Sequence, residues 1–128
     1  MCPTALPARN GPTKLERVAA AISVQEGWNV RGSLVRRQHN PGALVFARQP
    51  GARKGKSSYA RFDSDQQGQA ALIADLRAKF SRCMTLGEVM TRWSAKSYGG
   101  VIARQTGISE EEVVPVIAAP FCFAQAPA

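Results

Sequence analysis

Apolar positions recur at helical spacing in several stretches of the chain, and most of these stretches follow a serine or threonine. The pattern S/T-x-x-E/Q marks four candidate helix starts, and in it the hydroxyl and the side chain three residues later bond each other's backbone N–H groups. The pattern starts at Thr13, Ser64, Thr85 and Ser109. Together with the apolar spacing, it predicts helices over residues 14–26, 65–80, 86–93, 98–105 and 110–114.

The segment between the first two predicted helices has a different pattern, in which short runs are bounded by proline and glycine. Residues 43–47 form an apolar run, and residues 58–62 alternate in character. We expect these two runs to pair as a hairpin whose long loop spans residues 48–57. A helix, a small sheet and then several helices make an α+β domain.

The length of 128 residues suits one folded unit. We expect a flexible lead-in over residues 1–12, a domain over 13–114, and a tail rich in alanine and proline over 115–128. The N-terminus has no apolar segment of the kind that a secretory signal needs, and no apolar run approaches the ~20 residues of a membrane span. The three cysteines are odd in number and widely spaced, which implies no closed disulfide framework.

The formal net charge of +8 is concentrated in one stretch. Residues 31–61 contain eight basic side chains and no acidic one, whereas the rest of the chain is balanced at nine of each. The eight are Arg31, Arg36, Arg37, Arg48, Arg53, Lys54, Lys56 and Arg61. Such a stretch attracts a nucleic acid, an anionic membrane face or an anionic cell-wall polymer, or it serves only as a solvated basic loop.

Glu26 is the leading candidate for a catalytic group. It continues the apolar stripe four residues after Ile22, and it lies in the last helical turn, where the helix dipole disfavours negative charge. Trp28 follows closely and could cover it. These features favour a protonated carboxyl, as a general acid requires, while the alternative is an exposed glutamate at a frayed helix end. With one histidine and no C-x-x-C pair, we expect no metal site and no cofactor.

Three motifs follow one another from the end of the first predicted helix. They are Gln25-Glu26-Gly27-Trp28, Gly32-Ser33-Leu34 and Arg37-Gln38-His39-Asn40-Pro41-Gly42-Ala43-Leu44. In this order they resemble a lysozyme-like family of peptidoglycan-cleaving proteins of phage particles and bacterial genomes, the virion-associated muralytic (lytic transglycosylase-like) proteins. The family pattern is E-G-[WF], G-S-L and R-N-N-N-P-G-N-[LI]. Later segments at residues 46–52, 59–64, 68–72 and 84–93 follow the family order, so the resemblance covers about residues 18–112.

Two departures from the family pattern stand out. Of the four asparagines in the third motif the chain keeps Asn40 alone, and it lacks the A-P-x-x-E-N segment that usually precedes the fourth helix. If the missing asparagines position the sugar, substrate binding is weakened or altered.

The resemblance implies a lysozyme-like fold whose cleft runs between the first helix and the small sheet, with Glu26 at its floor. Glu26 would protonate the β-1,4 glycosidic oxygen between N-acetylmuramic acid and N-acetylglucosamine. Either the substrate's own groups complete the reaction, or a second carboxylate does. Asp63 is the candidate second carboxylate, although it also stands where it would assist the cap of the next helix.

The same resemblance makes Arg37, His39, Asn40 and Tyr59 candidates for substrate binding. Three of these also have a plainer interpretation, because asparagine before Pro-Gly is ordinary turn chemistry, histidine in a turn is often a surface residue, and an aromatic strand residue often fills the core. The expected partners are peptidoglycan glycan strands, with other virion proteins beside them. The protein would reside in a phage virion or in the bacterial cytoplasm before release, and act at the periplasmic cell wall.

Two other functions compete with peptidoglycan cleavage. One is a virion structural protein of the same fold without catalytic activity, which the missing asparagines favour. The other is a basic nucleic-acid-binding module, which the charged stretch suits. Nucleic acid is the less favoured partner, because the chain carries no known nucleic-acid-binding motif and interleaves only Phe46 and Tyr59 with its basic residues.

Overall fold

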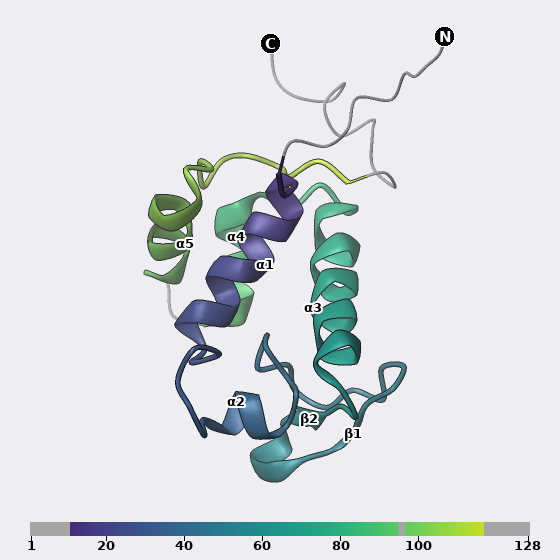
Figure 1. Ribbon diagram of the computed structural model, residues 1–128. Coiled ribbons are helices and arrows are strands. Elements are labelled where there is room, and N and C mark those ends of the chain that lie inside the picture. The colour runs from purple at the N-terminus through teal and green to yellow at the C-terminus, as the bar shows by residue number, and fades with distance from the viewer. Residues whose placement is uncertain (1–10, 95–96, 117–128) are drawn as a thin grey trace, which may run out of the picture.

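The computed structural model describes residues 11–94 and 97–116. The fold is of the expected mixed α+β class, with several helices and one small antiparallel sheet. The elements in chain order are α1 (Lys14–Gln25), α2 (Leu34–Arg37), β1 (Arg53–Lys54), a 3₁₀ turn (Lys56–Ser58), β2 (Ala60–Arg61), α3 (Asp65–Phe80), α4 (Leu86–Trp93) and α5 (Tyr98–Thr106). Four helices, α1, α3, α4 and α5, gather at one end of the fold and are here called the helical region. Residues 27–63 form the other end and are here called the small region (Figure 1).

The helix starts follow the capping pattern predicted from the sequence. Thr13 Oγ1 accepts from the N–H of Glu16 at 3.1 Å, and Glu16 Oε1 accepts from the N–H of Thr13 at 2.8 Å. The same reciprocal pair closes the start of α4. Four of the five predicted helices are confirmed to within about one residue at each end.

The predicted helix over residues 110–114 is wrong. This segment lies in an irregular conformation along the start of α4, where the carbonyls of Glu110 and Glu112 accept from the N–H groups of Gly87 and Leu86 at 2.9 and 2.8 Å. The first N–H groups of a helix have no partner within it, so this segment caps α4 from outside. The carbonyls that a helix over residues 110–114 would bond internally cap α4 instead.

The predicted hairpin is only partly correct. Residues 43–47 make one isolated bridge, between Val45 and Tyr59, whereas the two-stranded sheet pairs β2 with β1, from within the expected loop. Ala43 and Arg48 have φ angles of 51° and 58°, which turn the chain at both ends of the apolar run. Such left-handed conformations interrupt an extended strand.

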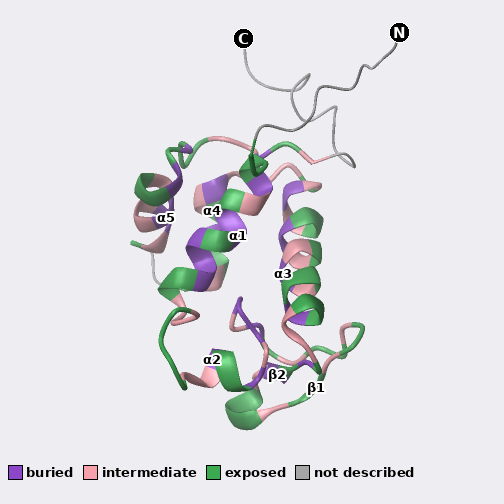
Figure 2. Cartoon of the chain, in the orientation of Figure 1, coloured by how far each residue is buried: buried purple, intermediate pink, exposed green. Residues whose placement is uncertain are grey.

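The helical region has one apolar core to which all four of its helices contribute. Figure 2 shows its buried positions on facing sides of the helices. Its fully buried side chains include Val18, Ile22, Leu72, Leu76, Phe80, Leu86, Val89, Met90 and Ile102. The core of the small region contains only Leu44, Ala60 and Phe62. Trp93 packs against both cores and donates from Nε1 to the carbonyl of Gly42 at 3.1 Å, which joins the two regions.

Gly68 lets the two regions approach closely. A Cβ atom on this residue of α3 would lie 1.9 Å from the carbonyl oxygen of His39 and 2.8 Å from Cδ of Pro41. No larger side chain fits without moving the backbone of the turn.

Three further expectations concern the ends of the chain, the cysteines and the membrane. Residues 1–10 and 117–128, which cover most of the predicted lead-in and tail, lie outside the described residues, and Val116 still packs on the helical core.

Cys83 is disulfide-bonded, so the interpretation that the cysteines form no framework needs correction at this residue; an odd number still allows one pair. Within the described ranges, every helix is too short or too polar to cross a membrane.

Candidate functional site

Glu26 ends α1 as its C-cap residue, as the sequence predicts. Its N–H donates to the carbonyl of Ile22 at 2.9 Å, and Gly27, with φ 95°, turns the chain away toward the small region. The side chain is partly buried, and the hydroxyl of Tyr98 donates to Oε2 at 2.9 Å. Glu26 is therefore a positioned carboxylate rather than an exposed group at a frayed helix end.

Tyr98, the first residue of α5, is held as a neutral hydrogen-bond donor. Burial, the negative charge of Glu26 and the hydrogen bond to it raise the pKa of the phenol above its ordinary value. The bond occupies one carboxylate oxygen of Glu26. The other oxygen, Oε1, has no hydrogen-bond partner among the described residues.

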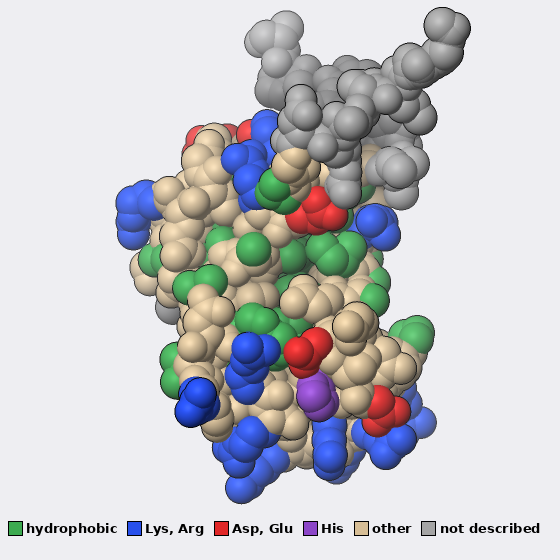
Figure 3. All heavy atoms as spheres, viewed as in Figure 1, with side chains coloured by type: hydrophobic (Ala, Val, Ile, Leu, Met, Phe, Trp, Pro, Cys, Tyr) green, Lys and Arg blue, Asp and Glu red, His purple; other side chains and the backbone are tan. Residues whose placement is uncertain are grey.

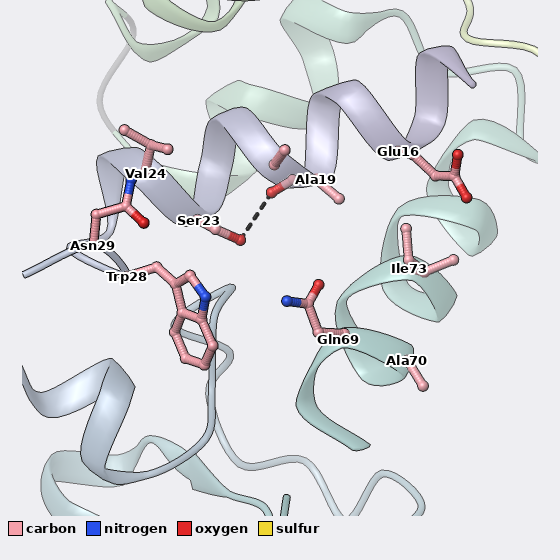
Figure 4. A pocket seen from close by; sticks show the side chains of 10 residues that line it. Glu16, Ala19, Ser23, Val24, Trp28, Asn29, Gln69, Ala70 and Ile73 are labelled. Atoms are coloured by element: carbon pink, nitrogen blue, oxygen red, sulfur yellow. Dashed lines mark hydrogen bonds between the residues drawn. The ribbon is translucent and has the colours of Figure 1, made fainter. Parts of the chain in front are cut away.

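A groove of about 510 Å³ lies between α1 and α3, close to Glu26 in sequence but not lined by it. Trp28 stands at one end, with Ser23 of α1 on one wall and Gln69 and Ile73 of α3 on the other (Figure 4). The guanidinium of Arg36 lies 4.3 Å from the centre of the Trp28 ring and stacks on it. Glu26 does not line this groove, so the groove is not the cleft that the family resemblance implies.

Asn40 is a structural residue of the small region. Its side chain is buried, with 1% of its surface exposed. Nδ2 donates to the carbonyls of Leu44 and Ala60 at 3.0 and 2.9 Å, and Oδ1 accepts from the N–H of Leu44 at 3.0 Å. A side chain so enclosed binds no sugar without losing these bonds, so the turn interpretation of Asn40 is the one that the geometry supports.

His39 lies partly exposed in the turn after α2, with φ 52°. Its Nδ1 is 2.7 Å from Oδ1 of Asp65, and Arg36 lies 3.7 Å from the other oxygen of the same carboxylate. The three side chains form a surface network that ties α2 to the start of α3.

The remaining candidates do not converge on Glu26. Arg37 is exposed and donates from Nε to the carbonyl of Gly32 at 3.1 Å, while Tyr59 is partly buried opposite Val45. Asp63 is exposed, 3.3 Å from Arg53, and its N–H donates to Oε1 of Gln67 in the cap of α3. Neither a hydrogen bond nor an ion pair joins Asp63 to Glu26 in the described structure.

The contact that sequence reasoning missed is the one between Tyr98 and Glu26. The two residues are 72 positions apart, so no local spacing pattern relates them. In the ranges that the structure covers, no group of three or more His, Cys, Asp or Glu side chains is placed to hold a metal ion. No family model, curated protein or solved structure matches this chain.

Proposed function

We propose that this protein cleaves peptidoglycan glycan strands, as a muramidase or lytic transglycosylase with a lysozyme-like fold, and that Glu26 is its general acid. The observation that carries the proposal is the geometry of this carboxyl. It sits at a helix C-terminus, partly buried, with one oxygen held by Tyr98 and the other unengaged. The motifs around Glu26 and the order of the later segments support the same activity.

In the proposed reaction Oε1 of Glu26 donates its proton to the β-1,4 glycosidic oxygen between N-acetylmuramic acid and N-acetylglucosamine. The bond from C1 of the muramic acid to that oxygen breaks, and the N-acetyl carbonyl of the same sugar stabilises the cation at C1. The 6-hydroxyl of that sugar, or a water molecule, then attacks C1 and returns a proton to Glu26. The first route leaves a 1,6-anhydro ring and the second leaves a reducing end.

Tyr98 acts in this scheme as a positioning residue. Its hydroxyl keeps Glu26 in one orientation, and its raised pKa keeps it a donor to a higher pH than an ordinary phenol.

A single carboxylate suffices for this scheme. Asp63 is engaged by Arg53 and has no bond to Glu26, so the observations favour a route without it. Arg37, His39 and Tyr59 remain proposed contacts of the glycan, since each has an exposed or partly exposed side chain. Asn40 instead holds the backbone at Leu44 and Ala60. Other virion proteins would be partners of a particle-borne enzyme.

The test is the release of soluble muropeptides from purified peptidoglycan, separated and identified by mass. We expect the wild type to release them and Glu26→Gln, which keeps the size of the side chain but removes the transferable proton, to release none. Glu111→Gln is the matched control, because Glu111 is exposed and bonds only Ser109 nearby. Asp63→Asn should keep most activity.

Circular dichroism and thermal melting establish that each variant is folded. Equal release by wild type and Glu26→Gln contradicts the assignment of the acid. A folded wild type that binds peptidoglycan and releases nothing indicates the virion structural protein of the same fold.

A further inference from the structure

A second pocket, of about 380 Å³, lies beneath α2 and is here called the basic pocket. Its rim carries Arg37 from α2, Lys54 from β1, Lys56 from the 3₁₀ turn and Arg61 from β2, and none of the described residues that line it is acidic. Figure 3 shows basic side chains gathered over this end of the molecule. Four of the eight basic residues of the charged stretch thus line one pocket.

The four cations of the basic pocket lack carboxylate partners in the described structure. The nearby acidic groups are engaged elsewhere, because Asp63 pairs with Arg53 and Asp65 pairs with Arg36 and His39. Like charges held together around one pocket repel each other, and an anion entering it relieves that repulsion.

A buried donor at the wall of the basic pocket is unsatisfied. Gln38 lines the pocket with 6% of its surface exposed, and Oε1 accepts from the N–H of Lys56 at 2.6 Å. That bond fixes which end of the amide is oxygen. Nε2 is buried and has no hydrogen-bond partner in the part of the chain that the structure describes. Since buried polar groups are nearly always paired, this amide is a place where a ligand oxygen is expected.

The backbone around Gln38 holds its side chain at the wall of the basic pocket. A Cβ atom on Gly55 would lie 2.5 Å from Oε1 of Gln38 and 2.7 Å from the carbonyl oxygen of Tyr59, a backbone atom, so only glycine lets the chain pass so close. Ser57 and Ser58, in the turn that carries Lys56, have φ angles of 58° and 70°. Two consecutive left-handed residues other than glycine cost free energy, which the surrounding bonds have to offset.

We propose that the basic pocket binds a phosphate group, free or as a phosphate ester, with Gln38 Nε2 donating to one oxygen and the four cations neutralising its charge. Phosphate suits four cations better than a carboxylate does, because it carries up to two negative charges and offers more acceptor oxygens. Arginine guanidinium groups, two of which line the pocket, match phosphate oxygens in pairs. Glu26 does not line this pocket, which shares Arg37 with the proposed glycan contacts.

The test is titration with inorganic phosphate at low ionic strength, followed by calorimetry and by NMR of the side-chain amides. We expect saturable binding that shifts the Gln38 amide resonance, and weaker binding of acetate at matched ionic strength. Glycerol phosphate tests whether the pocket also admits a phosphate ester. If it does, the ester binds and the same substitutions weaken its binding; if it does not, only free phosphate binds.

Gln38→Glu is the sharpest variant. It keeps the size of the side chain and the acceptor for Lys56, but replaces the unpaired donor with a negative charge. We expect phosphate affinity to fall at least about tenfold. The melting temperature without phosphate should be unchanged or higher, because the new carboxylate pairs with the cations.

Lys54→Gln and Arg61→Gln should each weaken binding several-fold, whereas the control Arg31→Gln, in the same basic stretch but outside the pocket, should not. Equal weakening by Arg31→Gln shows diffuse charge attraction and overturns the proposal. Acetate binding as tight as phosphate, or no saturable binding by the folded wild type, overturns it as well.

Discussion

The helical region and the small region are stabilised in different ways. In the helical region, four helices bury one continuous apolar cluster, and polar side chains act mainly at the helix starts. In the small region only three residues form the apolar core, and the buried amides of Asn40 and Gln38 bond the backbone of several loops. We therefore expect substitutions of buried polar side chains to destabilise the small region more than the small change in side-chain size suggests.

The largest effect should come from Gly68→Ala, at the contact between the regions. The added Cβ collides with the carbonyl of His39, a backbone atom, so the turn or α3 has to move. We expect a loss of about 3 kcal/mol or more of unfolding free energy in urea titrations.

Gly100→Ala is the matched control, because it also adds a methyl group to a helix. There the nearest atom is the flexible end of Arg104 at 3.4 Å. The change should stay within about 1 kcal/mol, in the stabilising direction. Similar losses at both positions contradict the idea of a specific close approach.

Asn40→Asp tests the polar interior of the small region. The new side chain has the same shape but loses both donors, and its oxygen faces the carbonyls of Leu44 and Ala60. We expect a loss of about 2–4 kcal/mol of stability at neutral pH, measured by denaturant titration. Gln49→Glu serves as the comparison, since Gln49 bonds Ala47 and Val45 from a more exposed position. A cost below about 1 kcal/mol for Asn40→Asp contradicts the account.

Trp93→Phe tests the link between the two cores. It removes the Nε1 donor to Gly42 while keeping an aromatic ring, and should cost about 1 kcal/mol. The loss should appear mainly in the small region. Hydrogen exchange of the Ala60 N–H, bonded to Leu44, should speed up more than that of Val89 in α4. Equal acceleration at both sites shows that Trp93 does not tie the regions together.

The smallest effect on stability, and the most informative about the site, concerns Tyr98. The pKa of Tyr98 is raised in the folded protein, so at a pH above the ordinary pKa of a phenol the unfolded state loses its proton first. The contribution of Tyr98 to stability is therefore lost as the pH rises through the folded pKa. In a Tyr59→Phe background Tyr98 is the only tyrosine, and its tyrosinate absorbance can be followed directly. Glu26→Gln should move that titration to lower pH, because it removes the adjacent negative charge. An unchanged titration contradicts the contact.

The helical region was largely predictable from the sequence because its signals are local. A cap residue, a partner three positions later and an apolar stripe determine α3 and α4 without knowledge of the rest of the chain. The segment after α5 shows where this reasoning stops. Ser109 carries the capping pattern, yet its neighbours serve α4 instead, because long-range bonds to Leu86 and Gly87 replace a local helix.

The small region and the candidate site were less predictable, because long-range contacts shape them. The position of Glu26 at a helix end follows from periodicity, but its partner Tyr98 comes from α5. The role of Asn40 was left open between turn and binding, and only its burial decides between them. The unpaired donor of Gln38 is a property of packing that no sequence pattern carries.

The assignment of Glu26 as the general acid is tested by the mass of the glycan ends that appear when purified peptidoglycan is incubated with wild type and with Glu26→Gln side by side. We expect new anhydro or reducing muramic ends from the wild type and none from the folded variant. The same ends from both proteins, or none from the wild type, would contradict it.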